Sequence, residues 1–179
     1  MSAHTSPARS VYAQFSAAAG RWPDRPFLNV LPETAEAYGI AAGEMTYGDA
    51  LDGIDQLRDR YQAAGYRSGA RVMLLLENRP GFVLHWFALN ALGLSVVPVN
   101  PDLQSAELTY MAGHCEPVLA IATEKRIADL EAASEAAGVP FPVIGEATEP
   151  PTVSGTAADV HTPSREQEAA MLYTSGTTG

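Results

Sequence analysis

The sequence contains a single cysteine, Cys115, among its 179 residues. One cysteine cannot form an internal disulfide, which favours a reducing compartment, so we expect a cytoplasmic location. Cys115 ends a series of apolar residues at helical spacing, a position where a small buried thiol is common. We interpret it as a core residue, with a catalytic thiol as the alternative.

Basic residues are also scarce. The chain has 11 Lys and Arg against 21 Asp and Glu, which gives a formal net charge of −10. Such a charge opposes nonspecific binding to nucleic acid and attraction to anionic membranes. The overall field does not attract an anionic nucleotide either. A phosphate site on this chain would therefore have to work through local backbone donors.

No membrane-spanning or secretory segment is expected. Residues 1–9 are polar and lack the apolar centre of a signal peptide. The longest apolar run, 82–99, is just long enough to cross a membrane. It contains His85, Asn90 and Pro98, however, and it has no basic flank. We interpret this run as a buried helix followed by a buried strand.

The histidines do not predict a metal site. His4, His85, His114 and His161 are scattered, and none has a partner at the spacing that metal ligands usually show. His114 lies beside the apolar stripe of an expected helix. We interpret it as a surface or hydrogen-bonded histidine.

Apolar periodicity predicts an α/β fold. Thr46 and Asp49 have the spacing of a capping box, and a helix with a regular apolar face follows until Gly65. The unbroken apolar run 72–76 is typical of a strand covered on both faces. Further expected helices, two of them capped by Ser105 and Thr123, alternate with strands and predict a largely parallel sheet flanked by helices. The other expected elements are helices at 9–19 and 81–92, strands at 27–31, 44–46, 95–99, 117–122, 141–144 and 169–174, and a loop or hairpin tip at 32–43.

Two stretches are expected to lack regular structure. Residues 1–8 are polar and predict a disordered tail, and residues 146–165 are rich in helix and strand breakers, which predicts a loop. We expect residues 9–179 to form one partial domain. Asn78 and Asn100 follow strands at the edge where α/β sheets usually bind ligands. We interpret both as turn residues, with a ligand role as the alternative.

The strongest functional signal is a glycine- and hydroxyl-rich run after the expected strand 169–174. Glycines let backbone N–H groups turn toward one point, and hydroxyls add further donors, which suits a phosphate chain. No lysine follows Gly176, so the run is not a Walker A motif. A polar turn after a strand is the alternative interpretation. The run is Thr174, Ser175, Gly176, Thr177, Thr178 and Gly179.

Together with Tyr173, this run resembles the phosphate-loop signature of the adenylate-forming (AMP-binding) superfamily. That superfamily includes acyl-CoA synthetases, the adenylation domains of peptide synthetases, and luciferases. The segment 91–101, Ala-Leu-Gly-Leu-Ser-Val-Val-Pro-Val-Asn-Pro, is similar to a second family segment at the expected distance upstream. The similarity extends from about Thr46 to Gly179.

The resemblance implies part of the large N-terminal domain of such an enzyme and a two-step reaction. The carboxylate of an acid attacks the α-phosphorus of ATP, pyrophosphate leaves, and a thiol, often that of coenzyme A, then displaces AMP. The resemblance also implies Mg²⁺, and that Thr174, Ser175, Gly176, Thr177, Thr178 and Gly179 cover the β- and γ-phosphates. No catalytic residue and no metal ligand is assigned within the chain.

The sequence stops before the Pro-Lys-Gly-like tail, the adenine pocket and the lid lysine of the family, so we expect this chain alone to be catalytically inert. The segments 84–93 and 97–101 are most similar to CoA ligases of fatty, aryl or carnitine-type acids. A peptide-synthetase adenylation domain is one alternative, and a non-catalytic α/β module that binds a nucleotide or partner is another. The sequence does not indicate the acid, the thiol acceptor or the oligomeric state.

Overall fold

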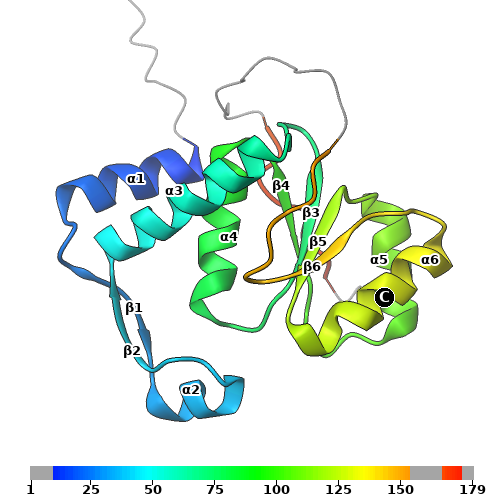
Figure 1. The fold of residues 1–179 in the computed structure, drawn as a ribbon, viewed down its shortest axis with the longest axis horizontal. Helices are drawn as coiled ribbons and strands as arrows, with labels where there is room; N and C mark the ends of the chain where they lie inside the picture. The colour runs from blue at the N-terminus through cyan, green and yellow to red at the C-terminus, as the bar shows by residue number, and fades with distance from the viewer. Residues whose placement is uncertain (1–9, 154–166, 175–179) are drawn as a thin grey trace, which may run out of the picture.

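A parallel β-sheet forms the centre of the protein (Figure 1). The structure is a computed structural model that describes residues 10–153 and 167–174. The strand order is β4-β3-β5-β6, and every neighbouring pair is parallel. This confirms the predicted α/β fold with a largely parallel sheet. The strands are β3 (Arg71–Leu75), β4 (Ser95–Pro98), β5 (Leu119–Ala122) and β6 (Val143–Gly145).

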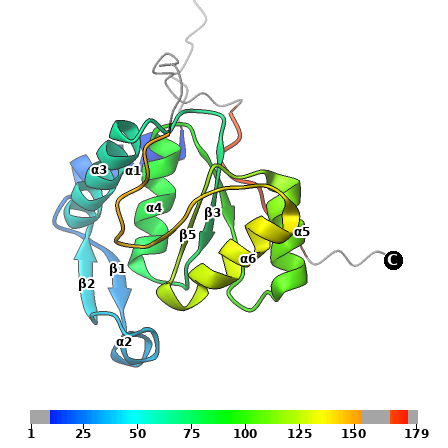
Figure 2. The same cartoon turned by 45° about the vertical axis from the view of Figure 1, so that its right-hand side comes forward.

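Helices cover both faces of this sheet (Figure 1 and Figure 2). α1, α3 and α4 lie on one face, and α5 and α6 lie on the other. Val72 and Leu74 of β3 pack into the first layer, and Met73 and Leu75 pack into the second. All four are buried, as their unbroken apolar run predicted. The helices are α1 (Val11–Arg21), α3 (Tyr47–Ala63), α4 (Pro80–Ala91), α5 (Ser105–Cys115), the short 3-10 helix η1 (Glu124–Arg126) and α6 (Ile127–Ala137).

An antiparallel hairpin projects from the first layer (Figure 1). Its strands β1 (Pro26–Val30) and β2 (Gly43–Thr46) pair with each other, and the short helix α2 (Pro32–Tyr38) forms its tip. The sequence predicted only a loop or hairpin tip here, so α2 was missed. The local signals are nevertheless present. Pro32 occupies the first turn of α2, and Gly39 ends it with a φ of 64°.

The observed N-terminal ends of the helices can be compared with the capping residues that the sequence predicted. The Asp49 amide donates to Thr46 Oγ1 at 3.1 Å, and the Thr46 amide donates to Asp49 Oδ2 at 3.0 Å, which confirms the capping box of α3. The predicted cap at Ser105 is wrong, because Gln104 is the N-cap of α5 and Ser105 is already helical. Thr123 occupies the N-cap position of η1, which leads into α6, but its side chain makes no cap hydrogen bond, so a side-chain cap at Thr123 is not observed.

The predicted buried strand at 169–174 is reduced to one parallel bridge between Ala170 and Val96 of β4. The described residues that follow the bridge have no regular structure. Leu172 is 67% exposed, so an apolar sequence does not indicate burial here. The reason is position: the segment lies beside β4 at the edge of the sheet (red in Figure 1), where it is not covered like a central strand.

The apolar run 82–99 is divided between α4 and β4, as predicted. None of the helices within the described ranges is long and apolar enough to cross a membrane. The side-chain amide of Asn90, which is buried in α4, donates to the carbonyls of Leu94 at 3.0 Å and Ala169 at 2.9 Å. The side-chain nitrogen of Asn90 therefore finds partners inside the protein, whereas its buried Oδ1 has none among the described residues.

The predicted loop at 146–165 falls only partly on described residues. Residues 146–153 contain no helix or strand. The Val153 amide donates to the carbonyl of Ala64 at 2.8 Å, which ties this stretch to the end of α3. Residues 154–165 and the predicted tail at 1–8 lie outside the described ranges.

Candidate functional site

All strands of the parallel sheet end at one edge, where ligands of α/β proteins usually bind. The bridge between Ala170 and Val96 is parallel too, so the chain reaches Thr174 at this same edge. The topology thus brings together residues that are distant in sequence. The polar residues that follow the strands are Glu77 and Arg79 after β3, Asn100 after β4, Lys125 after β5 and Glu146 after β6.

A groove of about 610 Å³ opens at this edge. Thr174, the first of the predicted phosphate-binding residues, is exposed and lines it. The walls are mainly apolar and aromatic, and they include Pro98 at the end of β4, Tyr110 and Met111 of α5, and Tyr173. The residues at the start of the glycine-rich run, Tyr173 and Thr174, therefore line the groove. The other predicted residues, Ser175, Gly176, Thr177, Thr178 and Gly179, lie outside the described residues.

The loop after β4 forms one wall of the groove. Asn100 Oδ1 accepts a backbone hydrogen bond at 2.9 Å within its own turn, which supports its interpretation as a turn residue. Arg126 holds this loop from outside, because its guanidinium donates to the carbonyls of Pro101 and Leu103, the latter at 2.9 Å. Arg126 also pairs with Asp129 at 2.5 Å, and its side chain is only 17% exposed.

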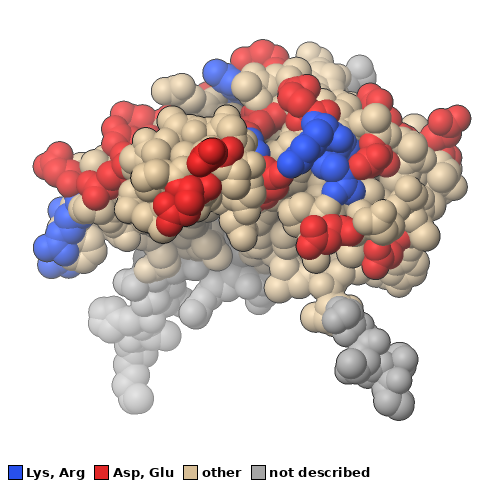
Figure 3. Space-filling model, turned by 90° about the horizontal axis from the view of Figure 1, so that it is seen from below, with Lys and Arg blue, Asp and Glu red and all other residues tan. Residues whose placement is uncertain are grey.

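A chain of ion pairs lies at the end of β3. The Glu77 carboxylate, which is 10% exposed, accepts hydrogen bonds from Arg79 and Lys125. Arg79 also pairs with Glu146 at 3.1 Å and donates to the carbonyl of Tyr38 in α2 at 3.4 Å. Burial raises the pKa of Glu77, but the hydrogen bonds from Lys125 and Arg79 outweigh this and hold it below its usual value. Seen from below, basic side chains at this surface are bordered by acidic ones (Figure 3).

Cys115 and His114 occupy the end of α5 behind the groove. Burial raises the pKa of the Cys115 thiol to about 11, so it is protonated at neutral pH. The interpretation of Cys115 as a core residue is confirmed. His114 is exposed, and its Nδ1 lies 2.7 Å from the hydroxyl of Tyr173, so it is a hydrogen-bonded surface histidine, as predicted.

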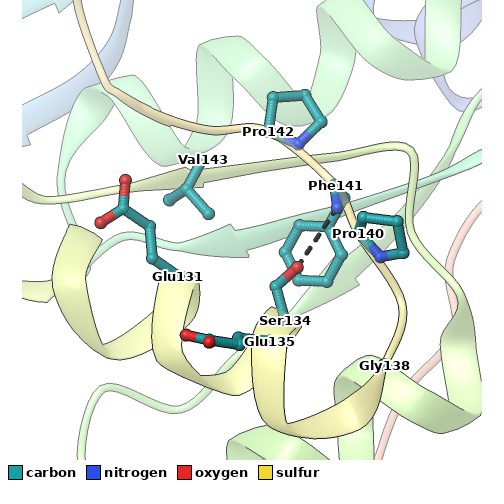
Figure 4. Close-up of a pocket in the computed structure, with 8 residues that line it drawn as sticks. All are labelled: Glu131, Ser134, Glu135, Gly138, Pro140, Phe141, Pro142 and Val143. Carbon is teal, nitrogen blue, oxygen red and sulfur yellow. Dashed lines mark hydrogen bonds between the residues drawn. The ribbon is translucent and has the colours of Figure 1, made fainter.

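A second pocket, of about 600 Å³, lies between α6 and the chain that enters β6 (Figure 4). Glu131 and Glu135 of α6 face it, together with the ring of Phe141. Its buried hydroxyl, Ser134 Oγ, is already satisfied: it accepts from the Phe141 amide at 3.2 Å and donates to the carbonyl of Val139 at 2.8 Å. The pocket lies at the start of a strand, away from the edge where the strands end, and we assign no role to it.

The sequence analysis singled out Thr174 and Asn100, both of which line the groove, but it missed the charged residues of this edge. The missed residues are Glu77, Arg79, Lys125 and Arg126. Their position directly after buried parallel strands is the signal that could have found them. Within 10–153 and 167–174, no group of three or more His, Cys, Asp or Glu side chains is arranged to hold a metal ion.

Comparison with known proteins identifies a family and several curated relatives. The family model described as AMP-binding enzyme matches residues 15–179. A sulfoacetate–CoA ligase of Cupriavidus necator is 29% identical over 100% of this chain and 35% of its own length. An isonitrile lipopeptide synthase of Mycobacterium tuberculosis is 31% identical over 83% of this chain and 6% of its own length. The chain thus spans 35% of the ligase and a far smaller share of the synthase.

Solved structures share the fold. The crystal structure of an anthranilate–CoA ligase in complex with anthranoyl-AMP matches with a TM-score of 0.75 and 20% identity, over 100% of this chain and 34% of that one. A fatty acyl CoA synthetase of Mycobacterium tuberculosis matches with a TM-score of 0.67 and 20% identity, over 93% of this chain and 33% of that one. At such identities the likeness concerns the fold.

Proposed function

Because this chain belongs to the AMP-binding enzyme family, we propose that it is part of an ATP-dependent ligase that joins a carboxylic acid to coenzyme A. The observation that carries this proposal is the parallel bridge at Val96, which leads the chain to the groove at Thr174. The groove, at about 610 Å³, falls within the usual size of small-molecule pockets. The similarity to a sulfoacetate–CoA ligase supports the choice of a CoA ligase.

The proposed reaction has two steps. A carboxylate oxygen attacks the α-phosphorus of ATP, the bond from that phosphorus to the oxygen bridging to the β-phosphate breaks, and pyrophosphate leaves. The thiol of coenzyme A then loses its proton, its sulfur attacks the acyl carbon, and AMP leaves. Residues 174–179 hold the β- and γ-phosphates through backbone N–H groups and hydroxyls. Donors placed there stabilise the negative charge that develops on the leaving pyrophosphate.

Mg²⁺ stays a prediction for this reaction. The residues of the described ranges do not fit a Mg²⁺ site, since no suitable group of ligands is found among them. The Glu77 carboxylate, which follows β3, is engaged by Arg79 and Lys125. We therefore assign no step to a metal ion.

The proposal is tested by acid-dependent exchange of pyrophosphate into ATP, using the full-length protein and a panel of carboxylic acids. Thr174→Val and Ser175→Ala should each lower the exchange rate roughly tenfold or more, as expected when a donor to a charged group is lost. Thr34→Val, in α2, is the matched control and should keep the wild-type rate. Exchange with none of the acids would overturn the proposal. Residues 1–179 alone should show no exchange.

A carrier-protein thiol is the second candidate acceptor. The similarity to an isonitrile lipopeptide synthase favours it, because that relative is 31% identical over 83% of the chain. The two candidates share the adenylation step, so pyrophosphate exchange does not separate them. Release of AMP with coenzyme A as acceptor supports the ligase, whereas release only with a phosphopantetheine-bearing carrier protein supports the alternative.

A further inference from the structure

The side chain of Tyr173 is held by α5 at the residue that directly precedes Thr174. Its hydroxyl lies 2.7 Å from Nδ1 of His114. Its ring stands edge-on to the imidazole, with the centroids 5.6 Å apart and the planes at 81°. Tyr110 stacks on His114 at 5.7 Å and 11°, and it also meets Tyr173 edge-on. The three rings form one cluster, in which Tyr110 and Tyr173 line the groove.

This cluster is the last described attachment before the glycine-rich run. The amide of Val96 donates to the carbonyl of Ala169 at 3.1 Å, and the amide of Met171 donates to the carbonyl of Val96 at 3.0 Å. Among the described residues, no backbone hydrogen bond to the sheet follows Met171. Leu172 is 67% exposed. The direction in which the chain leaves the sheet therefore depends on Tyr173 and its contacts.

The phenol of Tyr173 is protonated at neutral pH, because burial raises its pKa to about 12. It can donate to an unprotonated Nδ1 of His114, and its oxygen can accept from a protonated one. A phenylalanine at either position would keep an aromatic ring in the cluster but lose this bond. The bond and the ring packing can thus be tested separately.

We propose that His114 is a positioning residue for the predicted phosphate-binding run: its hydrogen bond with Tyr173 fixes where the chain leaves the sheet at Thr174. This inference rests on the proposed function of that run. His114 does not touch the phosphates. It acts through Tyr173 and the backbone of Thr174.

The test uses the full-length protein with His114→Phe, Tyr173→Phe and the double variant. Loss of one net hydrogen bond should raise the KM for ATP in pyrophosphate exchange about fivefold in each single variant. The maximal rate should change less than KM, since the reacting groups are untouched. The double variant should be no worse than either single one, because both remove the same bond. His114→Asn, which offers an amide oxygen near the position of Nδ1, should restore most of the ATP affinity.

A second measurement separates failure of this inference from failure of the proposed function. Amide hydrogen exchange at Leu172, Tyr173 and Thr174 should be faster in His114→Phe than in the wild type, and unchanged in Thr109→Val, a control on α5. Absence of pyrophosphate exchange in the wild type would overturn the proposed function, and amide exchange would still decide the role of His114. An unchanged KM for ATP, or unchanged amide exchange in His114→Phe, would overturn the inference.

Discussion

The hydroxyl of Tyr61 lies 2.6 Å from Nδ1 of His85, between α3 and α4. On the opposite side of the ring, His85 Nε2 lies 3.0 Å from the carbonyl of Glu146. Nε2 therefore carries the proton and donates, while Nδ1 accepts from the tyrosine. A neutral, buried imidazole thus joins two helices to the segment after β6. The carboxylate of that same Glu146 pairs with Arg79 at the candidate site.

Mild acid should destabilise the protein through His85. Burial lowers the pKa of His85 to about 4, whereas an unfolded histidine titrates near 6.5. Between these values only the unfolded state binds the proton. The stabilisation is therefore complete above pH 6.5 and is lost as the pH falls toward 4. The free energy of unfolding should fall by about 2 kcal/mol between pH 7 and pH 5.

Urea unfolding at pH 7 and pH 5 measures this effect. At these pH values carboxylates are mostly ionised in both states, so the histidine dominates the difference. The free energy of unfolding of His85→Asn should change much less with pH than that of the wild type. If the free energy of unfolding changed equally with pH in the wild type and in His85→Asn, His85 would not be the source of the pH dependence.

Loss of the hydroxyl should affect the free energy of unfolding differently at two neighbouring buried tyrosines. Tyr61→Phe leaves the buried Nδ1 of His85 without its donor, so the free energy of unfolding should fall by about 1–3 kcal/mol. Tyr66 packs edge-on against Tyr61 at 5.9 Å. Its hydroxyl is buried and has no hydrogen-bond partner among the described residues. Tyr66→Phe should therefore be neutral or stabilising. Chemical denaturation of both variants provides the comparison, and a larger loss for Tyr66→Phe would refute it.

The ion pairs of Glu77 should differ in strength according to exposure. Glu77→Gln removes the charge that faces Arg79, whose side chain is 12% exposed, and should lower the free energy of unfolding by about 1–3 kcal/mol, because a buried charge loses one of its two carboxylate partners. Lys125 is 66% exposed, so Lys125→Met should change it by less than about 1 kcal/mol. Equal losses in denaturant unfolding would show that burial does not decide the strength of these pairs.

Arg126 should hold the wall of the groove. Arg126→Ala removes the donors to the carbonyls of Pro101 and Leu103. The amide of Leu103, which donates to the carbonyl of Asn100 at 3.2 Å, should then exchange with solvent about tenfold faster, because local opening of the turn becomes easier. Arg71→Ala is the matched control, since Arg71 lies at the opposite end of β3 and pairs with Glu168. Hydrogen exchange of the two variants checks this, and equal protection of Leu103 in Arg126→Ala and wild type would argue against it.

Local patterns in the sequence determined most of the individual elements. The capping box of Thr46 and Asp49, the proline at the start of α4 and the apolar run 72–76 act over a few residues, so their effects can be read without the fold. The glycine- and hydroxyl-rich run at 174–179 is local as well, and it indicated the family. Predictions failed where one local pattern is compatible with two structures. Residues 32–43 were predicted to be a loop or hairpin tip but contain α2, and the predicted strand at 169–174 forms only one bridge.

The arrangement of the candidate site was decided only by the tertiary structure. Glu77 meets Lys125, and Arg79 meets Glu146, because the strand order β4-β3-β5-β6 places the ends of β3, β5 and β6 side by side. His114 reaches Tyr173 because Ala170 pairs with the free edge of β4. The period of apolar residues reports which side chains face a core, but it does not specify which strands become neighbours. Contacts between distant residues therefore appear only when the sheet is assembled.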